Sequence, residues 1–98
     1  MIRLSKSCIS EEEKKAVLNV LDSEFLGMGS EVKKFEEELE IFFNTNTLCV
    51  ASGTAALQLA LEACDVGLGD EVLVPSLTYL ASFQSISACS AIPIPCDI

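Results

Sequence analysis

The residues best suited to chemistry are small polar ones that follow an apolar run near the middle of the chain. Ser52, Gly53 and Thr54 come directly after residues 48–51 and directly before a segment rich in helix-forming residues. Glycine lets a ligand approach the backbone closely, hydroxyls donate hydrogen bonds, and the free amides that start a helix favour an anion. This turn is a candidate phosphate site, although the same residue types also form an ordinary helix cap.

A second candidate is Tyr79, the only tyrosine, which comes one residue after Thr78 where a second apolar strand leads into a helix. An aromatic ring there could stack on a planar ligand, or it could pack beneath the helix. The common nucleotide motifs are missing. The sequence has no Walker A pattern, and Gly67-x-Gly69 lacks the third glycine of a dinucleotide fingerprint.

Hydrophobic periodicity predicts the elements that position these residues. Ser10 and Glu13 form a capping-box pattern, and the last apolar run contains Pro93 and Pro95, which favour a sheet edge. The predicted order is a helix after Ser10, a helix capped by Ser30, strand 48–51, helix 55–61, strand 71–74, helix 76–89 and strand 91–95. This order predicts an α/β fold, with N-terminal helices followed by the start of a mostly parallel sheet.

Composition restricts the classes of function. The chain has 98 residues, with 6 Lys and Arg against 15 Asp and Glu and a formal net charge of −9. This length fits one domain, and the negative charge argues against nucleic acid as a partner. Because the sequence contains no histidine, it cannot form Ser-His or Cys-His nucleophile pairs or His-dependent metal sites. We therefore expect no metal site.

The cysteines and the uncharged stretches predict a reduced, non-membrane protein. The five cysteines are odd in number, form no C-x-x-C motif and lie mostly in apolar runs, which favours buried free thiols. Residues 41–61 and 72–96 are long enough to span a bilayer, but polar residues, glycine or proline interrupt both. No signal peptide is recognisable, so the expected compartment is the cytoplasm.

Taken together, several short segments resemble one enzyme family. They are L-S-K at 4–6, I-S-E-E-E at 9–13, L-G-M-G at 26–29 with Val32 and F-E at 35–36, S-G-T-A-A-L at 52–57, G-D-E-V at 69–72 and V-P-S-L-T-Y at 74–79. In this order they resemble the DegT/DnrJ/EryC1/StrS family, which contains sugar aminotransferases that depend on pyridoxal 5'-phosphate (PLP). The resemblance covers essentially all 98 residues.

The resemblance implies a fold, a cofactor and roles for four residues. Residues 1–98 would form the N-terminal part of the large domain of a fold-type-I PLP enzyme, and the domain would be incomplete. Gly53, Thr54 and Ala55 match the motif that binds the PLP phosphate in the family. Tyr79 matches the aromatic position that stacks on the pyridine ring.

The chain departs from the family pattern at two positions that do not touch the cofactor phosphate, and it lacks the family's catalytic lysine and aspartate. The family often has histidine at the position of Gln58 and an aromatic W-[IL]-G run where this chain has F-L-G at 25–27. The Schiff-base lysine and the aspartate that pairs with the pyridine nitrogen lie downstream in the family. The lysines present here, at positions 6, 14, 15, 33 and 34, lie among charged residues or in the N-terminal segment, so none is expected to replace that lysine. We predict no catalytic residue in this chain and assign no catalytic role to Asp97. We expect the chain alone to be inactive.

The implied complete enzyme would transfer an amino group from an amino acid, expected to be glutamate, to a keto group of a nucleotide-linked sugar. Such an enzyme would be a homodimer. Polysaccharide biosynthesis is the expected setting, and a glycoprotein or an antibiotic stays open as the destination of the product. Two alternatives remain open. The chain could be a phosphate- or PLP-binding module without chemistry, or a truncated gene product that associates with a partner.

Overall fold

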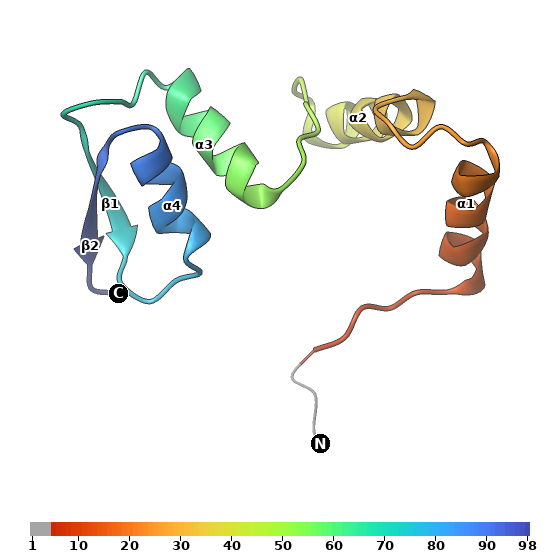
Figure 1. Cartoon of the computed structure of the whole chain (residues 1–98), viewed down its shortest axis with the longest axis horizontal. Helices are drawn as coiled ribbons and strands as arrows, with labels where there is room; N and C mark the ends of the chain where they lie inside the picture. Colours follow the sequence, from red (N-terminus) through yellow and green to blue (C-terminus); the bar gives the residue numbers. More distant parts are fainter. Residues whose placement is uncertain (1–4) are drawn as a thin grey trace. The chain divides into compact units, whose positions relative to one another are not determined.

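The structure is a computed structural model that describes residues 5–98, and the chain divides into two compact units between Leu48 and Cys49. The first unit contains two helices, and the second contains two helices and two strands (Figure 1). Each unit is described by itself below.

Helix α1 (Glu11–Asp22) begins at the predicted capping box. The Ser10 hydroxyl accepts a hydrogen bond from the Glu12 amide at 3.2 Å, and the Glu13 carboxylate accepts the Ser10 amide at 2.6 Å and also the Ser10 hydroxyl. These bonds satisfy amides that the first turn of a helix leaves without partners. They also hold the pKa of Glu13 below its ordinary value, because the Ser10 hydroxyl and the backbone amides stabilise the charged carboxylate.

Helix α2 (Ser30–Phe43) differs slightly from the prediction at its start. Gly29 is the N-cap and Ser30 is the first helical residue, so the expectation that Ser30 caps this helix was wrong by one position. The helix ends at Asn44, which adopts the left-handed conformation that terminates many helices.

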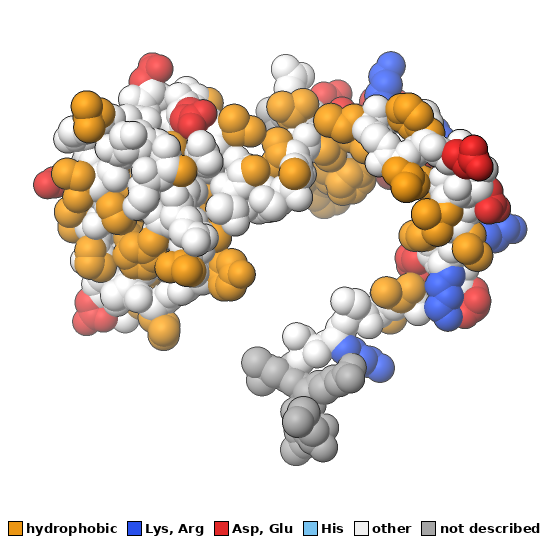
Figure 2. Space-filling view, viewed as in Figure 1, with side chains coloured by type: hydrophobic (Ala, Val, Ile, Leu, Met, Phe, Trp, Pro, Cys, Tyr) orange, Lys and Arg blue, Asp and Glu red, His pale blue; other side chains and the backbone are white. Residues whose placement is uncertain are grey.

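The apolar stripes of α1 and α2 are not buried. The sequence predicts that one face of each helix packs, but neither helix has a buried residue, and Val17 and Phe35 are both more than half exposed. Hydrophobic side chains are visible on the surface over both helices in Figure 2. Local hydrogen bonds and caps therefore define these helices, because no buried core forms among residues 5–48.

The second unit is a β-α-β arrangement preceded by an additional helix. It consists of helix α3 (Gly53–Ala63), strand β1 (Glu71–Pro75), helix α4 (Ala81–Ala88) and strand β2 (Ile92–Cys96). Strands β1 and β2 pair in parallel, and α3 packs against α4. The core is small and centres on Val74, Ile86 and Ala91, with Leu61 and Val66 packed against it. The parallel α/β architecture is as predicted.

Two predicted elements in this unit were wrong. No strand forms at residues 48–51, and the sheet of the described chain has two strands rather than three. A strand needs a neighbour for its ladder hydrogen bonds, and an apolar run alone does not supply one. Helix α4 begins at Ala81 rather than at Ser76, because the Ser76 amide pairs with the Cys96 carbonyl at 2.8 Å and keeps the chain beside β2.

The five cysteines are free, as predicted, but their predicted burial is mostly wrong. Only Cys89 is buried, whereas Cys8 and Cys64 are exposed and the remaining two are partly buried. Burial, and secondarily the charge of Glu62, raises the pKa of the Cys89 thiol. Cysteine burial therefore follows proximity to the small core of the second unit.

Candidate functional site

The first turn of α3 is a helix start with free backbone donors. The Ser52 hydroxyl accepts the Ala55 amide at 3.2 Å, and the Ser52 carbonyl accepts the Ala56 amide at 3.0 Å. The amides of Gly53 and Thr54 have no hydrogen-bond acceptor among residues 5–98. Of the three residues predicted to bind phosphate, two therefore offer a free N–H group, while the amide of Ala55 is occupied by the cap.

The space beside Gly53 is open. A Cβ atom built on Gly53 would meet no other atom within 4 Å, so the chain itself does not fill the approach to these amides. Thr54 is partly buried, and its hydroxyl has no partner in the described part of the chain. Two amides and one hydroxyl at the positive end of a helix form a donor set suited to an anion such as a phosphate.

The charge around this site is unusual for a phosphate site. Residues 49–98 contain no Lys or Arg, whereas they contain five acidic residues, which gives a formal charge of 0 − 5 = −5. These acidic residues are Glu62, Asp65, Asp70, Glu71 and Asp97. At the α3 turn, attraction for an anion therefore comes from neutral donors and the dipole of α3, and no Lys or Arg of this unit adds to it. A dianionic phosphate would need positive charge from outside residues 49–98 for tight binding.

Tyr79 lies in the loop between β1 and α4, and its side chain is 83% exposed. At this exposure the Tyr79 ring does not pack beneath α4, which was the alternative expectation for this residue. The Tyr79 carbonyl accepts the Ser82 amide at 3.1 Å, and the Thr78 and Ser82 hydroxyls lie 3.3 Å apart. These bonds fix the loop backbone and leave the ring available to a ligand.

The four predicted site residues lie in two places on the second unit. Gly53, Thr54 and Ala55 share the first turn of α3, and Tyr79 follows β1. Both places are at the end of the unit where β1 ends (Figure 1), which is where ligands of parallel α/β sheets bind. No hydrogen bond or ring contact joins the Tyr79 side chain to the α3 turn among residues 5–98.

The lysines have surroundings unlike those of a Schiff-base lysine. All five are exposed, and Lys14 and Lys34 form ion pairs with Glu11 at 2.5 Å and with Glu31 at 2.6 Å. The hydrogen bond and charge of Glu31 raise the pKa of Lys34. A nucleophilic lysine needs the opposite, a desolvated position and a lowered pKa.

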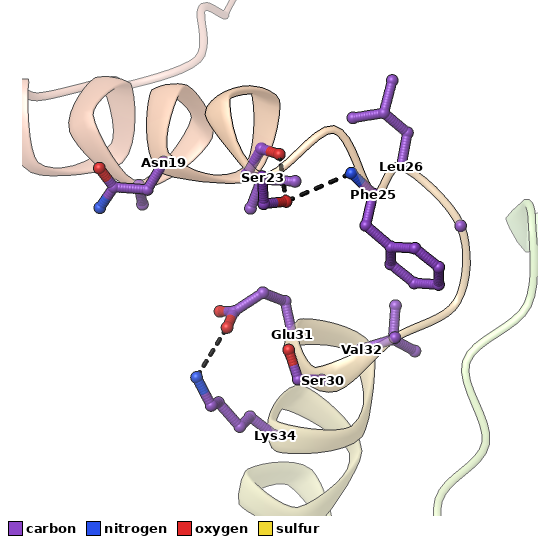
Figure 3. A pocket seen from close by; sticks show the side chains of 12 residues that line it. Asn19, Ser23, Phe25, Leu26, Ser30, Glu31, Val32 and Lys34 are labelled. Carbon is purple, nitrogen blue, oxygen red and sulfur yellow. Dashed lines mark hydrogen bonds and ion pairs between the residues drawn. The ribbon is translucent and has the colours of Figure 1, made fainter.

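A cavity of about 740 Å³ between α1 and α2 was not predicted from the sequence. Figure 3 shows the Phe25 ring beside it, with the Glu31–Lys34 ion pair on α2. The Phe25 ring packs on Gly29 so closely that a Cβ there would lie 2.5 Å from the ring. The F-L-G-x-G run at 25–29 was the available signal, but a run of residues does not specify the space between two helices.

The described residues contain no group of three metal-ligating side chains, and none of their helices is both long and apolar enough to cross a membrane.

Comparison with known proteins identifies one family. The model of the DegT/DnrJ/EryC1/StrS aminotransferase family matches residues 7–98. The dTDP-3-amino-3,4,6-trideoxy-alpha-D-glucose transaminase of Streptomyces venezuelae is 45% identical over 83 residues, which cover 84% of this chain and 22% of that protein. The L-glutamine:2-deoxy-scyllo-inosose aminotransferase of Streptomyces fradiae is 56% identical over 48 residues, which cover 49% of this chain and 11% of that protein.

A solved structure agrees in fold over nearly the whole chain. The putative sugar aminotransferase Spr1654 of Streptococcus pneumoniae, in its PMP form, matches with a TM-score of 0.88 and 40% identity. The match covers 99% of this chain and 25% of that one, so the chain spans about a quarter of the length of its relatives. The residues matched, the fold and the identity together show that this chain belongs to the DegT/DnrJ/EryC1/StrS aminotransferase family.

Proposed function

We propose that this chain is the cofactor-binding N-terminal segment of a PLP-dependent sugar aminotransferase. Gly53, Thr54 and Ala55 hold the phosphate of the cofactor, and Tyr79 stacks on its ring. The observation that carries this proposal is the open first turn of α3, with two free amides and a free hydroxyl at the position of the family's phosphate motif.

The residues present fit the phosphate group in donor type and in space. The Gly53 and Thr54 amides and the Thr54 hydroxyl donate to phosphate oxygens, and the absence of a side chain at Gly53 lets the oxygens approach. Ala55 contributes through its place in the turn, because its own amide donates to Ser52. Bound PLP supplies an electron sink for amino-group transfer, while these residues orient it.

The same features limit what this segment does alone. The second unit has no positive side chain to balance a phosphate dianion, and the lysines of the first unit are exposed and paired or solvated. We therefore expect weak cofactor binding and no amino transfer from residues 1–98 by themselves. In a complete enzyme, other parts of the chain or a second subunit of a homodimer supply the Schiff-base lysine and the positive charge.

The proposed substrate is a nucleotide-linked keto sugar, with glutamate as amino donor, for polysaccharide biosynthesis in the cytoplasm. Relatives that cover 84% to 100% of this chain have names that specify dTDP- or GDP-linked sugars. The relatives named for L-glutamine and 2-deoxy-scyllo-inosose cover 49% to 76% of it. The broader coverage favours the nucleotide sugar, and the second group makes glutamine the alternative donor.

A second candidate function is a PLP- or phosphate-binding module without chemistry, either independent or associated with a partner. The observation that favours it is the core of Val74, Ile86 and Ala91, which belongs to the second unit alone. Helix α3, which carries the proposed phosphate turn, contacts this core through Leu61.

A hybrid enzyme tests the first proposal. Residues 1–98 would replace the matching first quarter of the Streptococcus pneumoniae sugar aminotransferase, and PLP affinity and amino transfer from glutamate and glutamine to a dTDP-keto sugar would be measured. We expect a PLP-binding, active hybrid. Gly53→Ala should weaken PLP binding by roughly tenfold, about 1.4 kcal/mol, because its methyl group fills the approach to the free amides.

Gly67→Ala is the matched control, because a Cβ there makes only an ordinary contact of 3.9 Å with the Cys89 carbonyl and lies outside the site. Its PLP affinity should equal that of the unmodified hybrid. A folded hybrid that binds no PLP, or whose affinity is unchanged by Gly53→Ala, would contradict the proposed phosphate site.

A further inference from the structure

We propose that Ser82 is a positioning residue that holds Tyr79, and that a chain of hydrogen bonds along α4 connects this hold to helix α3. The ring of Tyr79 and the phosphate turn of α3 are then placed to meet one cofactor molecule. The inference rests on the proposed function, because it concerns how the proposed stacking ring is held. Ser82 itself is not expected to touch the cofactor.

The Tyr79 ring has no packing of its own to fix its place. Its side chain is 83% exposed and has no ring contact among residues 5–98. Stacking on a planar ligand needs a defined offset and distance between the two rings. Since the ring can take only a few rotamers relative to its backbone, the loop backbone between β1 and α4 decides where it stands. A loop that is already ordered also loses less conformational entropy when a ligand binds.

Ser82 bonds to the chain on both sides of this ring. Its amide donates to the Tyr79 carbonyl at 3.1 Å, and its hydroxyl lies 3.3 Å from the Thr78 hydroxyl. These two bonds close residues 78–82 into a turn that contains Tyr79. The N-cap residue of α4, Leu80, makes no side-chain cap hydrogen bond. The hydroxyl pair of Thr78 and Ser82 therefore ties the loop to the start of α4.

Ser85 holds Ser82 in turn. The Ser85 hydroxyl donates to the Ser82 carbonyl at 3.1 Å, and Ser85 is 2% exposed, the one buried polar side chain among residues 5–98. Alanine would fit a buried helical position and favours helix more than serine does, so packing alone does not account for a hydroxyl here. Hydroxyls that bond back to a carbonyl one turn earlier often bend a helix. The Ser85 hydroxyl thus acts on the first turn of α4, next to the Tyr79 loop.

The chain of hydrogen bonds reaches α3 through Cys89, the C-cap residue of α4. The Cys89 thiol lies 3.2 Å from the Ser85 carbonyl and 3.6 Å from the Gln58 carbonyl of α3. Ser82, Ser85 and Cys89 follow one another at spacings of three and four residues, so they share one face. Figure 1 shows α3 and α4 side by side, in agreement with their packing. The helix that carries the phosphate turn and the helix that follows Tyr79 are therefore joined.

Nitrogen-15 relaxation of the 98-residue chain without ligand tests the hold on Tyr79. In Ser82→Ala, we expect the order parameter of the Tyr79 amide to fall from the rigid range near about 0.85 towards the flexible range below about 0.6. Alanine favours helix more than serine, so a weaker α4 would not explain this loss. The amide signals of β1 report whether each variant is folded.

Ser87→Ala is the matched control for this substitution. Ser87 lies on the same helix, is exposed, and its hydroxyl has no hydrogen bond among residues 5–98. The order of the Tyr79 amide should be the same in Ser87→Ala as in the unmodified chain. A Tyr79 amide that is equally ordered in Ser82→Ala and Ser87→Ala would overturn the inference.

Titration with pyridoxamine 5'-phosphate measures the consequence for stacking. A stacked tyrosine ring moves the ring-proton signals of the ligand to lower frequency, whereas inorganic phosphate reports on the α3 turn alone. Ser82→Ala should reduce that movement and weaken pyridoxamine 5'-phosphate binding about threefold, because the ring is held less well. Ser82→Thr keeps a hydroxyl and should restore both. The affinity for inorganic phosphate should be the same in all three chains.

A double-mutant cycle with Tyr79→Ala shows whether Ser82 acts through the ring. In the Tyr79→Ala background, Ser82→Ala should cause no further loss of affinity for pyridoxamine 5'-phosphate. A loss of the same size with and without the Tyr79 ring would overturn the inference, since Ser82 would then act on the fold in general.

The two measurements separate this inference from the proposed function. If Ser82→Ala loosens Tyr79 but neither ligand shifts the Gly53 and Thr54 amides of the unmodified chain, the inference is supported and the proposed function is contradicted. If pyridoxamine 5'-phosphate shifts these amides and shows ring stacking that Ser82→Ala leaves unchanged, the proposed function stands and the inference is overturned.

Ser85→Ala measures the connection further along α4. It removes the hydroxyl that bonds to the Ser82 carbonyl, so it should lower the order of the Tyr79 amide, but by less than Ser82→Ala does. No effect of Ser85→Ala on Tyr79 in the folded chain would overturn the proposed connection to α3.

Discussion

The two units have similar apolar patterns but use them differently. In the first unit, α1 and α2 carry strong hydrophobic stripes and bury no residue. In the second, Val74 and Ile86 are only 3% and 4% exposed, although their unit has a single pair of strands. Helix formation thus follows from local signals such as a capping box, whereas burial requires contacts between segments far apart in the sequence.

The units also differ in charge. All six Lys and Arg residues lie in residues 1–48 and none in residues 49–98, and the Lys side chains visible in Figure 2 lie on the N-terminal segment and the first two helices. The unit that carries the proposed phosphate turn therefore has no basic side chain to neutralise a phosphate. Under the proposed function, its contribution to binding would be geometric, through backbone donors, and the charge would come from residues outside this unit.

The largest expected effect comes from the core of the second unit. Ile86→Ala removes buried methylene groups beside Val74 and should destabilise that unit by about 2 to 5 kcal/mol. Val17→Ala on α1 is the matched control and should change stability by no more than about 0.5 kcal/mol, because Val17 is exposed. Urea unfolding followed by circular dichroism measures both. Equal effects would mean that the two units do not differ in burial.

Glycine substitutions separate backbone strain from ligand access. Gly69 has a φ of 95°, so Gly69→Ala should destabilise the second unit by about 1 to 2 kcal/mol. Gly53 is the first residue of α3, and a Cβ there would lie in open space. Gly53→Ala should therefore leave the unfolding midpoint nearly unchanged while it weakens phosphate binding. A loss of stability in Gly53→Ala as large as that in Gly69→Ala would show that Gly53 serves the fold.

The rates at which individual cysteines react can be used to compare their burial. Burial raises the pKa of Cys89, so less thiolate is present and access is poorer, and its alkylation at pH 8 should be at least tenfold slower than that of exposed Cys64. Mass spectrometry of peptides after timed iodoacetamide treatment measures each rate. Similar rates would indicate that the core around Cys89 opens readily.

The smallest expected effect concerns the cap of α1. The folded-state pKa of Glu13 is lowered, so its contribution to helix stability is complete above the unfolded pKa and is lost as the pH falls through the folded pKa. Ser10→Ala should raise the pKa of Glu13 towards its ordinary value and slightly reduce helicity at neutral pH. Carbon-detected NMR titration of the Glu13 carboxyl group measures the shift, and an unchanged pKa would exclude the Ser10 hydroxyl as its cause.

Much of the fold was predictable where the signal is local. The Ser10–Glu13 box set the start of α1, and Pro75 and the Pro93–Pro95 pair marked the ends and edge of the strands. The wrong predictions concern segments whose structure depends on a hydrogen-bond partner far away in the sequence. The apolar run at 48–51 has no ladder in the described chain, and the start of α4 depends on the bond between Ser76 and Cys96.

The candidate site shows the same division. Its residue types and its place before a helix could be inferred from the sequence, as could the value of a glycine at position 53. That Ser52 occupies the Ala55 amide and leaves those of Gly53 and Thr54 free depends on cap geometry that residue types do not specify. The cavity between α1 and α2 likewise depends on how two helices meet.

The most direct test of the phosphate turn is an NMR titration of the 98-residue chain with pyridoxamine 5'-phosphate, which has no aldehyde and cannot react with lysines. We expect the amide signals of Gly53 and Thr54 to shift selectively, with weak affinity, while the Val72 and Val74 signals report an unchanged fold. Selective shifts of the lysine-bearing helices, or no shift at Gly53 and Thr54 in the folded chain, would contradict the assignment of the α3 turn as the cofactor-phosphate site.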